Sequence, residues 1–481
     1  MIDLSQRDRF DKGFCFPRLS EKQSLKIHEA SLEILERVGV RLYLDEAVQL
    51  FKKAGASVTD GNLIRVSSKI VEKALKTVPK QVILYNRNGN PAMPVAGYRC
   101  FYGPGSDCLN IIDHRTGQRR KAVVKDVVEG TTLCDFLPQI DFVMSMILPS
   151  DVDGTFADRY QMEAMLSHTT KPIIFVAYEM EGCRDAVEMA EMVMGGAEAL
   201  KSTPLIAGYI CTISGLRHNK EALEKLLFLA SKNLPSIYFP ASTAAITSPV
   251  TPAGSIALDF AGVLVGLTLV QLKQEGAPVI LPGMPPGATF DMKTFVTSYG
   301  EPERTIAQAL GQFYGFPMFA IAGASESKSV DSQAAAEAAL SLVVETLAGG
   351  NIIHNLGYLE SGLGFSLVQL VLCHEIVSWI RAFTTEFEVN DETLALDVIA
   401  EVGADGDFLN TDHTLKHYRE RWYPTYFERA NYDSWLKNGG KDFVQRAKEA
   451  VNQILAEHKP EPLPSDLKTK LREVIQRVGI R

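Results

Sequence analysis

Residues 236–283 read SIYFPASTAAITSPVTPAGSIALDFAGVLVGLTLVQLKQEGAPVILPG, and this segment decides the fold. A short apolar run at Ser236–Ala241 is followed by a polar loop that contains prolines. The apolar segment Gly254–Gln274 has the length of a helix, and a second short apolar run begins at Pro278. A strand, a loop, a helix and another strand in this order are typical of a β/α unit with parallel strands.

The same unit repeats on both sides of this segment. Short runs rich in β-branched and aromatic residues recur at a spacing that suits strand–helix repeats. Eight such runs are present: Arg99–Gly103, Ile140–Leu148, Pro172–Tyr178, Pro204–Cys211, Ser236–Ala241, Pro278–Gly283, Pro317–Ala322 and Asn351–Tyr358. The helical candidates between and after them are Val123–Leu137, Phe156–Ser167, Arg184–Met194, Lys220–Ser231, Gly254–Gln274, Glu301–Tyr314, Ser332–Leu347 and Phe365–Phe387. The sequence therefore predicts the α/β class and a (β/α)8 TIM-type barrel.

An open, doubly wound sheet is the alternative architecture. Such a sheet binds its ligand at a switch point, commonly through a glycine-rich loop after an early strand. The chain has no G-x-G-x-x-G after an early strand and no G-x-x-x-x-G-K-[ST] motif. The closed barrel is favoured.

The segments that flank the barrel are predicted to be helical. Ser20 is a suitable N-cap for a helix that Gly39 ends, and two shorter helices are expected at about 44–54 and 67–77. We therefore divide the chain into three parts. They are an N-terminal helical extension (1–98), a catalytic barrel (99–388) and a C-terminal helical extension (389–481).

Composition excludes several classes of function. The formal net charge of −9 comes without a basic stripe, so no nucleic-acid binding is expected. No run of 18 or more apolar residues and no secretory leader is evident, which indicates a cytoplasmic protein without a membrane span. The seven cysteines never form a C-x-x-C pair, which argues against a disulfide framework and a zinc ribbon.

Reacting groups in such a barrel stand at the carboxyl ends of the strands and in the loops that follow. This rule selects Tyr102, Asp107, Tyr178, Glu179, Cys211, Phe239, Met284, Glu326, Lys328, His354, Tyr358 and Glu360. The set is rich in aromatic residues, and aromatic faces attract quaternary ammonium ions. Ordinary barrel packing would account for any single member equally well. His354 is either a core histidine or a group that holds a substrate carboxylate.

Two other patterns carry less weight. His413 and His417 lie four residues apart and could share a metal ion, but no third ligand at a suitable spacing is evident, so we predict no metal site. Cys211 or Cys373 would act as a nucleophile only with a histidine within hydrogen-bond reach, which the sequence does not indicate.

The chain also resembles a known family. The segments that carry the resemblance include YGPGSDCLNIIDHRTGQRRKAVVKDVVEGTTLCDFLPQIDFV (102–143), the helical part of the opening segment (248–280) and SESKSVDSQAAAEAALSLVVETLAGGNIIHNLGYLESGL (325–363). They are similar to the trimethylamine methyltransferase family. The resemblance implies a (β/α) barrel that passes a methyl group from a methylamine or betaine to a cognate corrinoid protein.

One departure from the family pattern bears on the substrate. The trimethylamine enzymes carry pyrrolysine just after the segment that matches Asp331-Ser332-Gln333, and this chain has Ala334 and Ala335 there. A quaternary ammonium needs no special electrophile, because its nitrogen leaves as a neutral amine. The resemblance therefore implies a pyrrolysine-free member that uses glycine betaine, with carnitine, proline betaine and γ-butyrobetaine as alternatives.

We expect the substrate ammonium to be bound by Tyr102, Tyr178, Phe239 and Tyr358, and the substrate carboxylate by His354. No side chain is assigned to the chemical step, since the cob(I)alamin of the corrinoid partner is the nucleophile. We expect no tightly bound cofactor of the chain's own, and we expect a homo-oligomer. Two other functions stay open, namely a non-catalytic betaine-binding protein and a barrel that uses acid–base chemistry on a phosphate or carbonyl substrate. The lack of paired carboxylates and of a phosphate loop disfavours the latter.

Overall fold

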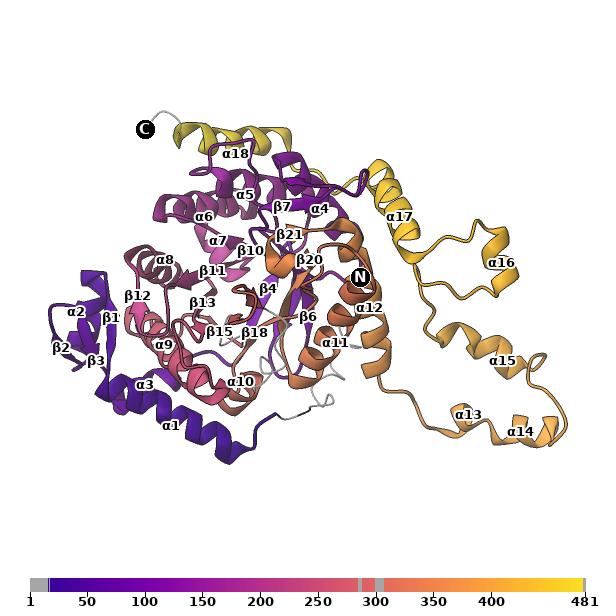
Figure 1. Cartoon of the computed structure of the whole chain (residues 1–481), viewed down its shortest axis with the longest axis horizontal. Coiled ribbons are helices and arrows are strands. Elements are labelled where there is room, and N and C mark those ends of the chain that lie inside the picture. The colour runs from indigo at the N-terminus through magenta and orange to yellow at the C-terminus, as the bar shows by residue number, and fades with distance from the viewer. Residues whose placement is uncertain (1–15, 17, 284–287, 299–306, 479–481) are drawn as a thin grey trace.

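The computed structural model describes residues 16, 18–283, 288–298 and 307–478. Its centre is a sheet of eight parallel strands in the order β6-β19-β18-β15-β13-β11-β10-β9 (Figure 1). The strands are β6 (Phe101–Pro104), β9 (Val143–Met144), β10 (Ile173–Val176), β11 (Ile206–Thr212), β13 (Ser236–Pro240), β15 (Val279–Pro282), β18 (Met318–Ile321) and β19 (Ile352–Leu356). Six of them lie inside a predicted apolar run, and β6 and β11 each extend one residue beyond theirs.

The two end strands of this sheet, β6 and β9, meet and close it. The N–H of Asp141, just before β9, donates to the carbonyl of Tyr102 at 2.7 Å, and the N–H of Asp107 donates to the carbonyl of Ser145 at 2.6 Å. The predicted (β/α)8 TIM-type barrel is thereby confirmed.

Helices surround the barrel as the apolar periodicity predicts. They are α4 (Val124–Phe136), α5 (Ala157–His168), α6 (Met180–Met194), α7 (Ala197–Ser202), α8 (Lys220–Ser231), α9 (Pro252–Lys273), α10 (Gln308–Tyr314), α11 (Ser332–Ala348) and α12 (Leu367–Thr384). The start of the predicted helix at 301–314 lies outside the described residues. Helices α9 and α12 are apolar and long enough to cross a membrane, but both are mostly buried, as core helices of a barrel are.

Side chains alternate along each strand, so the barrel has an inner and an outer core. Ile237, Phe239 and Phe319 belong to the inner core. The hairpin of β4 (Val82–Tyr85) and β5 (Pro91–Val95) adds Leu84 and Met93 to the same cluster. The backbone of the hairpin forms a hydrogen bond with the segment just before β11, because the Tyr85 N–H donates to the carbonyl of Pro204 at 2.9 Å. The hairpin therefore covers the amino-terminal end of the barrel.

The N-terminal extension contains the three predicted helices, α1 (Glu21–Arg37), α2 (Asp45–Lys53) and α3 (Ser68–Leu75). It is less helical than predicted, because β1 (Val40–Leu42), β2 (Ser57–Thr59) and β3 (Leu63–Arg65) form a sheet with β12 (Arg217–His218). Strands of three residues are too short to show a period in the sequence.

Small sheets lie in the loops between the barrel elements. One combines β7 (Asn110–Ile112), β8 (Arg119–Lys121), β20 (Tyr358–Leu359) and β21 (Gly364–Phe365), and the other combines β14 (Thr243–Ala244), β16 (Ala288–Phe290) and β17 (Thr297–Ser298). The first ties the loop after β6 to the loop after β19.

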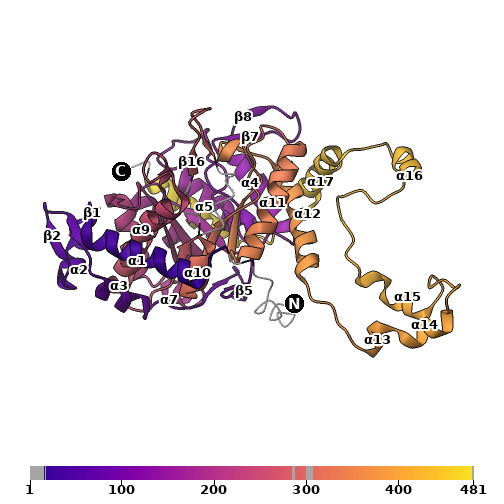
Figure 2. The same ribbon diagram turned by 60° about the horizontal axis from the view of Figure 1, so that its bottom comes forward.

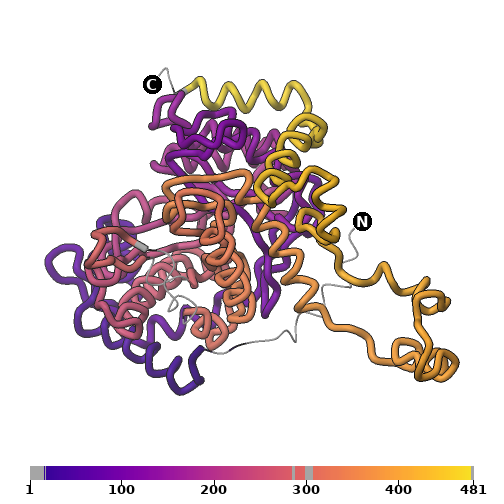
Figure 3. Tube along the Cα trace, turned by 45° about the vertical axis from the view of Figure 1, so that its right-hand side comes forward, coloured from indigo at the N-terminus to yellow at the C-terminus, as the bar shows by residue number. Residues whose placement is uncertain are grey.

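The C-terminal part is helical, as predicted. Helices α17 (Phe443–Glu457) and α18 (Ser465–Val478) pack on α12, α4, α5 and α6 (Figure 3). Between α12 and α17, the chain leaves the body of the molecule and forms a projection with α13 (Asp391–Leu394), α14 (Leu396–Val402), α15 (Asp412–His417) and α16 (Tyr432–Lys437) (Figures 1 and 2).

Candidate active site at the barrel mouth

Asp107 is a buried acid with a raised pKa at the carboxyl-terminal end of the barrel. It follows β6 in a left-handed conformation with φ of 60°. Its Oδ1 accepts a hydrogen bond from the Tyr178 hydroxyl at 3.1 Å and a longer one from Gln161 Nε2 at 3.4 Å. Burial raises the pKa of Asp107 to about 6, although these two hydrogen bonds oppose the rise. Asp107 is therefore a carboxyl group that changes charge near neutral pH.

Tyr178, the partner of Asp107, is held by its backbone. Its N–H donates to Oδ2 of Asp158 at 3.3 Å, and its carbonyl accepts from Lys225 Nζ at 3.3 Å. Lys225 is buried on α8, and burial lowers the pKa of its ammonium group. These contacts fix the loop after β10 while the Tyr178 side chain stays 37% exposed at the rim.

Cys211 lies near Asp107 on the inward face at the end of β11. Its side chain is exposed at the mouth, yet the surrounding protein raises the pKa of the thiol to about 11, with the charge of Asp107 adding to the rise. A thiol with this pKa is protonated at neutral pH and is a poor nucleophile. The possible nucleophilic role of Cys211 is not supported.

An aromatic cluster lies deeper in the barrel. His354 on β19 is buried, its Nδ1 lies 2.7 Å from the carbonyl of Ala320, and its ring stacks on Phe319 with centroids 4.1 Å apart. Tyr209 lies 6.1 Å from the His354 ring and stacks on Phe239 at 6.4 Å. Tyr209 also contacts Cys211. We call the side chains from Tyr178 and Asp107 at the rim, through Cys211 and Tyr209, to Phe239, Phe319 and His354 in the interior the row.

Three of the five predicted ligand-binding residues lie on this row, namely Tyr178, Phe239 and His354. Tyr358 is buried just above it, where its hydroxyl donates to the carbonyl of Ser106 and so links the loops after β19 and β6. Tyr102 points the other way. Its hydroxyl bonds to Thr346 Oγ1 at 2.8 Å in the outer core.

The expectation for Tyr102 therefore has to be corrected. The guanidinium of Arg381 lies over its ring at 5.1 Å, so the tyrosine packs against α11 and α12 outside the barrel. Phe101 is the inward-facing residue at this point of β6. Adjacent residues of a strand face opposite sides, and nearness to the strand end does not tell which side a residue faces.

The remaining strand-end candidates do not join the row. Glu326 accepts a hydrogen bond from Ser361, Lys328 Nζ donates to the Glu326 carbonyl at 2.7 Å, and Glu360 pairs with Arg119 at 2.9 Å. Glu179 is exposed at the start of α6. Met284 lies outside the described residues.

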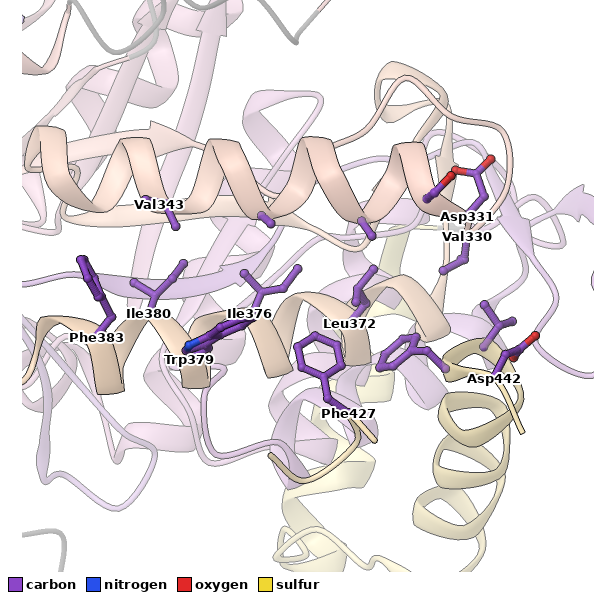
Figure 4. Close-up of a pocket in the computed structure, with 15 residues that line it drawn as sticks. Val330, Asp331, Val343, Leu372, Ile376, Trp379, Ile380, Phe383, Phe427 and Asp442 are labelled. Carbon is purple, nitrogen blue, oxygen red and sulfur yellow. The ribbon is translucent and has the colours of Figure 1, made fainter. Parts of the chain in front are cut away.

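Ala334 and Ala335 lie on the first turn of α11, outside the barrel. Asp331 caps this helix by accepting from Ala334 N–H at 2.9 Å. Ala334 is buried, and Ala335 lines an apolar groove of about 840 Å³ between α11 and α12 (Figure 4). The Ala334 carbonyl accepts a hydrogen bond from Gln369 Nε2 on α12 at 3.3 Å. The link between these two residues and the substrate class stays a prediction.

Of the two histidines in the projection, His417 contacts carboxylates. His413 and His417 have ring centroids 4.5 Å apart, and His417 Nδ1 lies 2.8 Å from Glu420. Within the ranges that the structure describes, no group of three or more His, Cys, Asp or Glu side chains is placed to hold a metal ion.

The sequence analysis did not predict two members of the row, Tyr209 and Phe319. Tyr209 and Phe319 lie in the middle of their strands, whereas the selection rule considers strand ends. The alternation along β11 could have identified Tyr209, because it stands two residues before Cys211 and therefore faces the same side.

A perturbed carboxyl group at the mouth of a closed barrel, above an aromatic interior, is an arrangement typical of (β/α)8 enzymes that act on small molecules. The chain belongs to the trimethylamine methyltransferase family, whose sequence profile matches residues 13–479. The family resemblance of the sequence is thereby confirmed.

Individual relatives agree with this assignment. A trimethylamine methyltransferase of Desulfitobacterium hafniense is 31% identical over 470 residues, which cover 97% of this chain and 94% of the relative. A glycine betaine methyltransferase of the same species is 28% identical over 468 residues, covering 96% and 97%. The crystal structure of the Methanosarcina barkeri monomethylamine methyltransferase shares the fold, with a TM-score of 0.52 at 11% identity and coverage of 94% and 91%.

Proposed function

We propose that the protein transfers a methyl group from a quaternary amine, with glycine betaine as the first candidate, to the Co(I) centre of a corrinoid protein. The observation that carries the proposal is the row from Asp107 and Tyr178 at the rim to His354 in the interior. A betaine has a cation at one end and a carboxylate at the other, and the row offers groups for both. One of the named relatives is a glycine betaine methyltransferase, which supports this substrate class.

The ammonium end is assigned to the rim. The Asp107 carboxylate supplies a counter-charge, and the Tyr178 ring supplies an aromatic face. Oδ1 of Asp107 accepts the Tyr178 and Gln161 hydrogen bonds, and no described residue donates to Oδ2. This arrangement differs from the expectation of an entirely aromatic site, because an acid takes part in it.

The carboxylate end is assigned to His354, with the Phe239 and Tyr209 rings beside the chain between the two ends. Nδ1 donates to the Ala320 carbonyl, so Nε2 acts as a donor toward a carboxylate only when the ring is protonated. Binding would thus place the carboxylate deep and the methyl groups at the rim.

This orientation is what the transfer requires. The corrinoid protein is too large to enter the barrel, so its cobalt has to meet the methyl carbon at the mouth. The carbon–cobalt bond forms as the carbon–nitrogen bond breaks, the nitrogen keeps the electron pair, and a neutral tertiary amine leaves. No proton is transferred, so no general base is needed. The chain contributes alignment and exclusion of water.

The other features of the proposal follow from the sequence. We propose a cytoplasmic enzyme whose catalytic barrel spans 99–388, that takes its corrinoid from a partner and that binds neither nucleic acid nor membrane. Carnitine, proline betaine and γ-butyrobetaine are the alternative substrates, since each combines a quaternary ammonium with a carboxylate.

The experiment is an anoxic assay in which methylcob(III)alamin formation is followed by absorbance. Free cob(I)alamin, and then a cognate corrinoid protein, would be incubated with the enzyme and with trimethylamine, glycine betaine, carnitine, proline betaine or γ-butyrobetaine separately. We expect turnover with one betaine and none with trimethylamine. Betaine binding by calorimetry without methyl transfer to either acceptor would identify a non-catalytic betaine-binding protein. Neither binding nor transfer would refute the proposal.

A further inference from the structure

Asn355, near the end of β19, has a backbone conformation that is rare for a residue with a side chain. Its φ of 85° lies in the left-handed region, and the register between β19 and β6 shifts between Ile353 and Leu356. A β-bulge of this kind takes up an extra residue on one face of the strand, and bulges beside active sites redirect side chains. Strained residues also gather at binding sites, so the position of the Asn355 side chain bears on function.

The bulge turns Asn355 toward the interior of the barrel. His354 faces inward, where its ring stacks on Phe319. In a regular strand Leu356 would face the same side as His354, but Leu356 belongs to the outer core. The extra residue that the bulge takes up is therefore Asn355, which follows His354 on the inward side.

The contact with Gly105 shows where the Asn355 side chain lies. A Cβ at Gly103 of β6 would meet the ring of Phe142, which belongs to the inner core. Gly105 comes two residues later on the same side, and a Cβ there would collide with Oδ1 of Asn355 and with the Tyr358 ring. The lack of a side chain at Gly105 makes room for both groups. The Asn355 amide therefore lies beside Tyr358 at the mouth, just above the row.

The Asn355 amide is buried without a protein partner. The residue is 4% exposed, and within the described part of the chain no residue forms a hydrogen bond with either amide atom. A buried amide without a partner is costly, and native proteins keep few of them. Oδ1 lies against Gly105, so the Nδ2 group, which carries two donors, faces away from β6. A ligand in the mouth would supply the acceptor that this group lacks.

We infer that Asn355 binds the carboxylate of the substrate, with Nδ2 donating to a carboxylate oxygen. The inference rests on the proposed function, because it places a betaine in the barrel. The neutral His354 ring offers no donor at Nε2, since its proton is on Nδ1 and bonds to the carbonyl of Ala320. Asn355 is the next residue on the same face, and its amide donates whatever the charge of His354. Asn355 therefore gives the site its preference for an ammonium compound that bears a carboxylate.

The test compares the binding of two ligands to the full-length chain by isothermal titration calorimetry. One ligand is the betaine that the wild type binds most tightly among the four candidates, and the other is tetramethylammonium, which has no carboxylate. The variant Asn355→Asp keeps the shape and tolerates the left-handed conformation, but it replaces the donor with an anionic acceptor. We expect a loss of betaine affinity of ~10-fold or more and no loss for tetramethylammonium.

The second variant is Asn355→Gly, because glycine keeps the left-handed conformation and removes the amide without adding a charge. We expect about a 10-fold loss for the betaine and none for tetramethylammonium. The matched controls are Asn233→Asp and Asn233→Gly. Asn233 is another left-handed asparagine, with φ of 56°, and it precedes β13 at the opposite end of the barrel. Both controls should bind both ligands with wild-type affinity.

Three results would overturn the inference. Wild-type betaine affinity in both Asn355 variants would overturn it and leave the proposed function intact. An equal loss for both ligands would also overturn it, because Asn355 would then shape the mouth rather than bind the carboxylate. A wild-type chain that binds none of the four betaines would overturn the proposed function and the inference together.

Discussion

The hydroxyl of Tyr178 donates to Oδ1 of Asp107 across 3.1 Å, and this contact joins the loops after β10 and β6 at the rim of the barrel. The two residues are 71 positions apart in the chain. Their meeting creates a carboxyl group that is partly desolvated but still bonded to two donors.

The variant Asp107→Asn is expected to weaken glycine betaine binding roughly 10-fold, or about 1.4 kcal/mol, because it removes the counter-charge of the ammonium ion. Asparagine tolerates the left-handed conformation, so the backbone should not change. Isothermal titration calorimetry is the measurement. The matched control is Asp60→Asn, a second left-handed aspartate that lies far from the mouth. Equal affinities for both variants and the wild type would remove Asp107 from the site.

The affinity for the cation should rise with pH through about 6, the pKa of Asp107, because the carboxyl group becomes charged there. Below this pH the protonated acid offers no counter-charge. Binding of tetramethylammonium, which does not titrate, would be measured from pH 5 to pH 8. The wild type should show the rise, and Asp107→Asn should follow a flat profile. A rise that persists in the variant would point to another group.

The raised pKa of Asp107 also means that this residue lowers the free energy of unfolding at neutral pH. Its folded-state pKa, about 6, lies above the ordinary 3.8, so its contribution is most favourable at low pH and is lost as the pH rises from about 4 to about 6. We expect Asp107→Asn to be more stable than the wild type at pH 7.5, by at most about 3 kcal/mol, and the difference to shrink toward pH 4.5. Chemical denaturation at both pH values tests this. A variant that loses stability at pH 7.5 would contradict it.

His354→Gln should separate recognition of the carboxylate from recognition of the ammonium. We expect roughly a 10-fold loss of affinity for glycine betaine, since a charge-assisted hydrogen bond is lost, and no change for tetramethylammonium. Calorimetry with both ligands measures the split. An equal loss for both would mean that His354 shapes the aromatic cluster rather than binding the carboxylate.

Tyr102→Phe tests the correction to the predicted site. It removes the hydrogen bond to Thr346 in the outer core and should cost about 1 kcal/mol of unfolding free energy, with no change in betaine affinity. Denaturant unfolding and calorimetry on the same preparation check both statements. A lower betaine affinity without a lower free energy of unfolding would show that Tyr102 does belong to the binding site.

The sequence predicted the barrel well because each strand buries both faces and therefore reads as an apolar run between polar loops. Strand ends could be located in the same way. The side of the strand to which a residue points could not be predicted, because a shift of one position reverses it. For this reason we predicted Tyr102 at the site, whereas Phe101 faces the interior. The contact between Tyr178 and Asp107 depends on how two loops fold over the rim, which no periodicity encodes. Short strands such as β1 and β2 were not predicted, because three residues are too few to show the alternation of apolar and polar residues.

The hairpin of β4 and β5 has a consequence for the order of events. It closes the amino-terminal end of the barrel, so a substrate in the interior has one way in and the product has the same way out. A corrinoid protein at the mouth would block that passage while it is bound. In the proposed methyl transfer, the quaternary amine would therefore bind first and the demethylated amine would leave last. The corrinoid protein would bind and dissociate between these two steps.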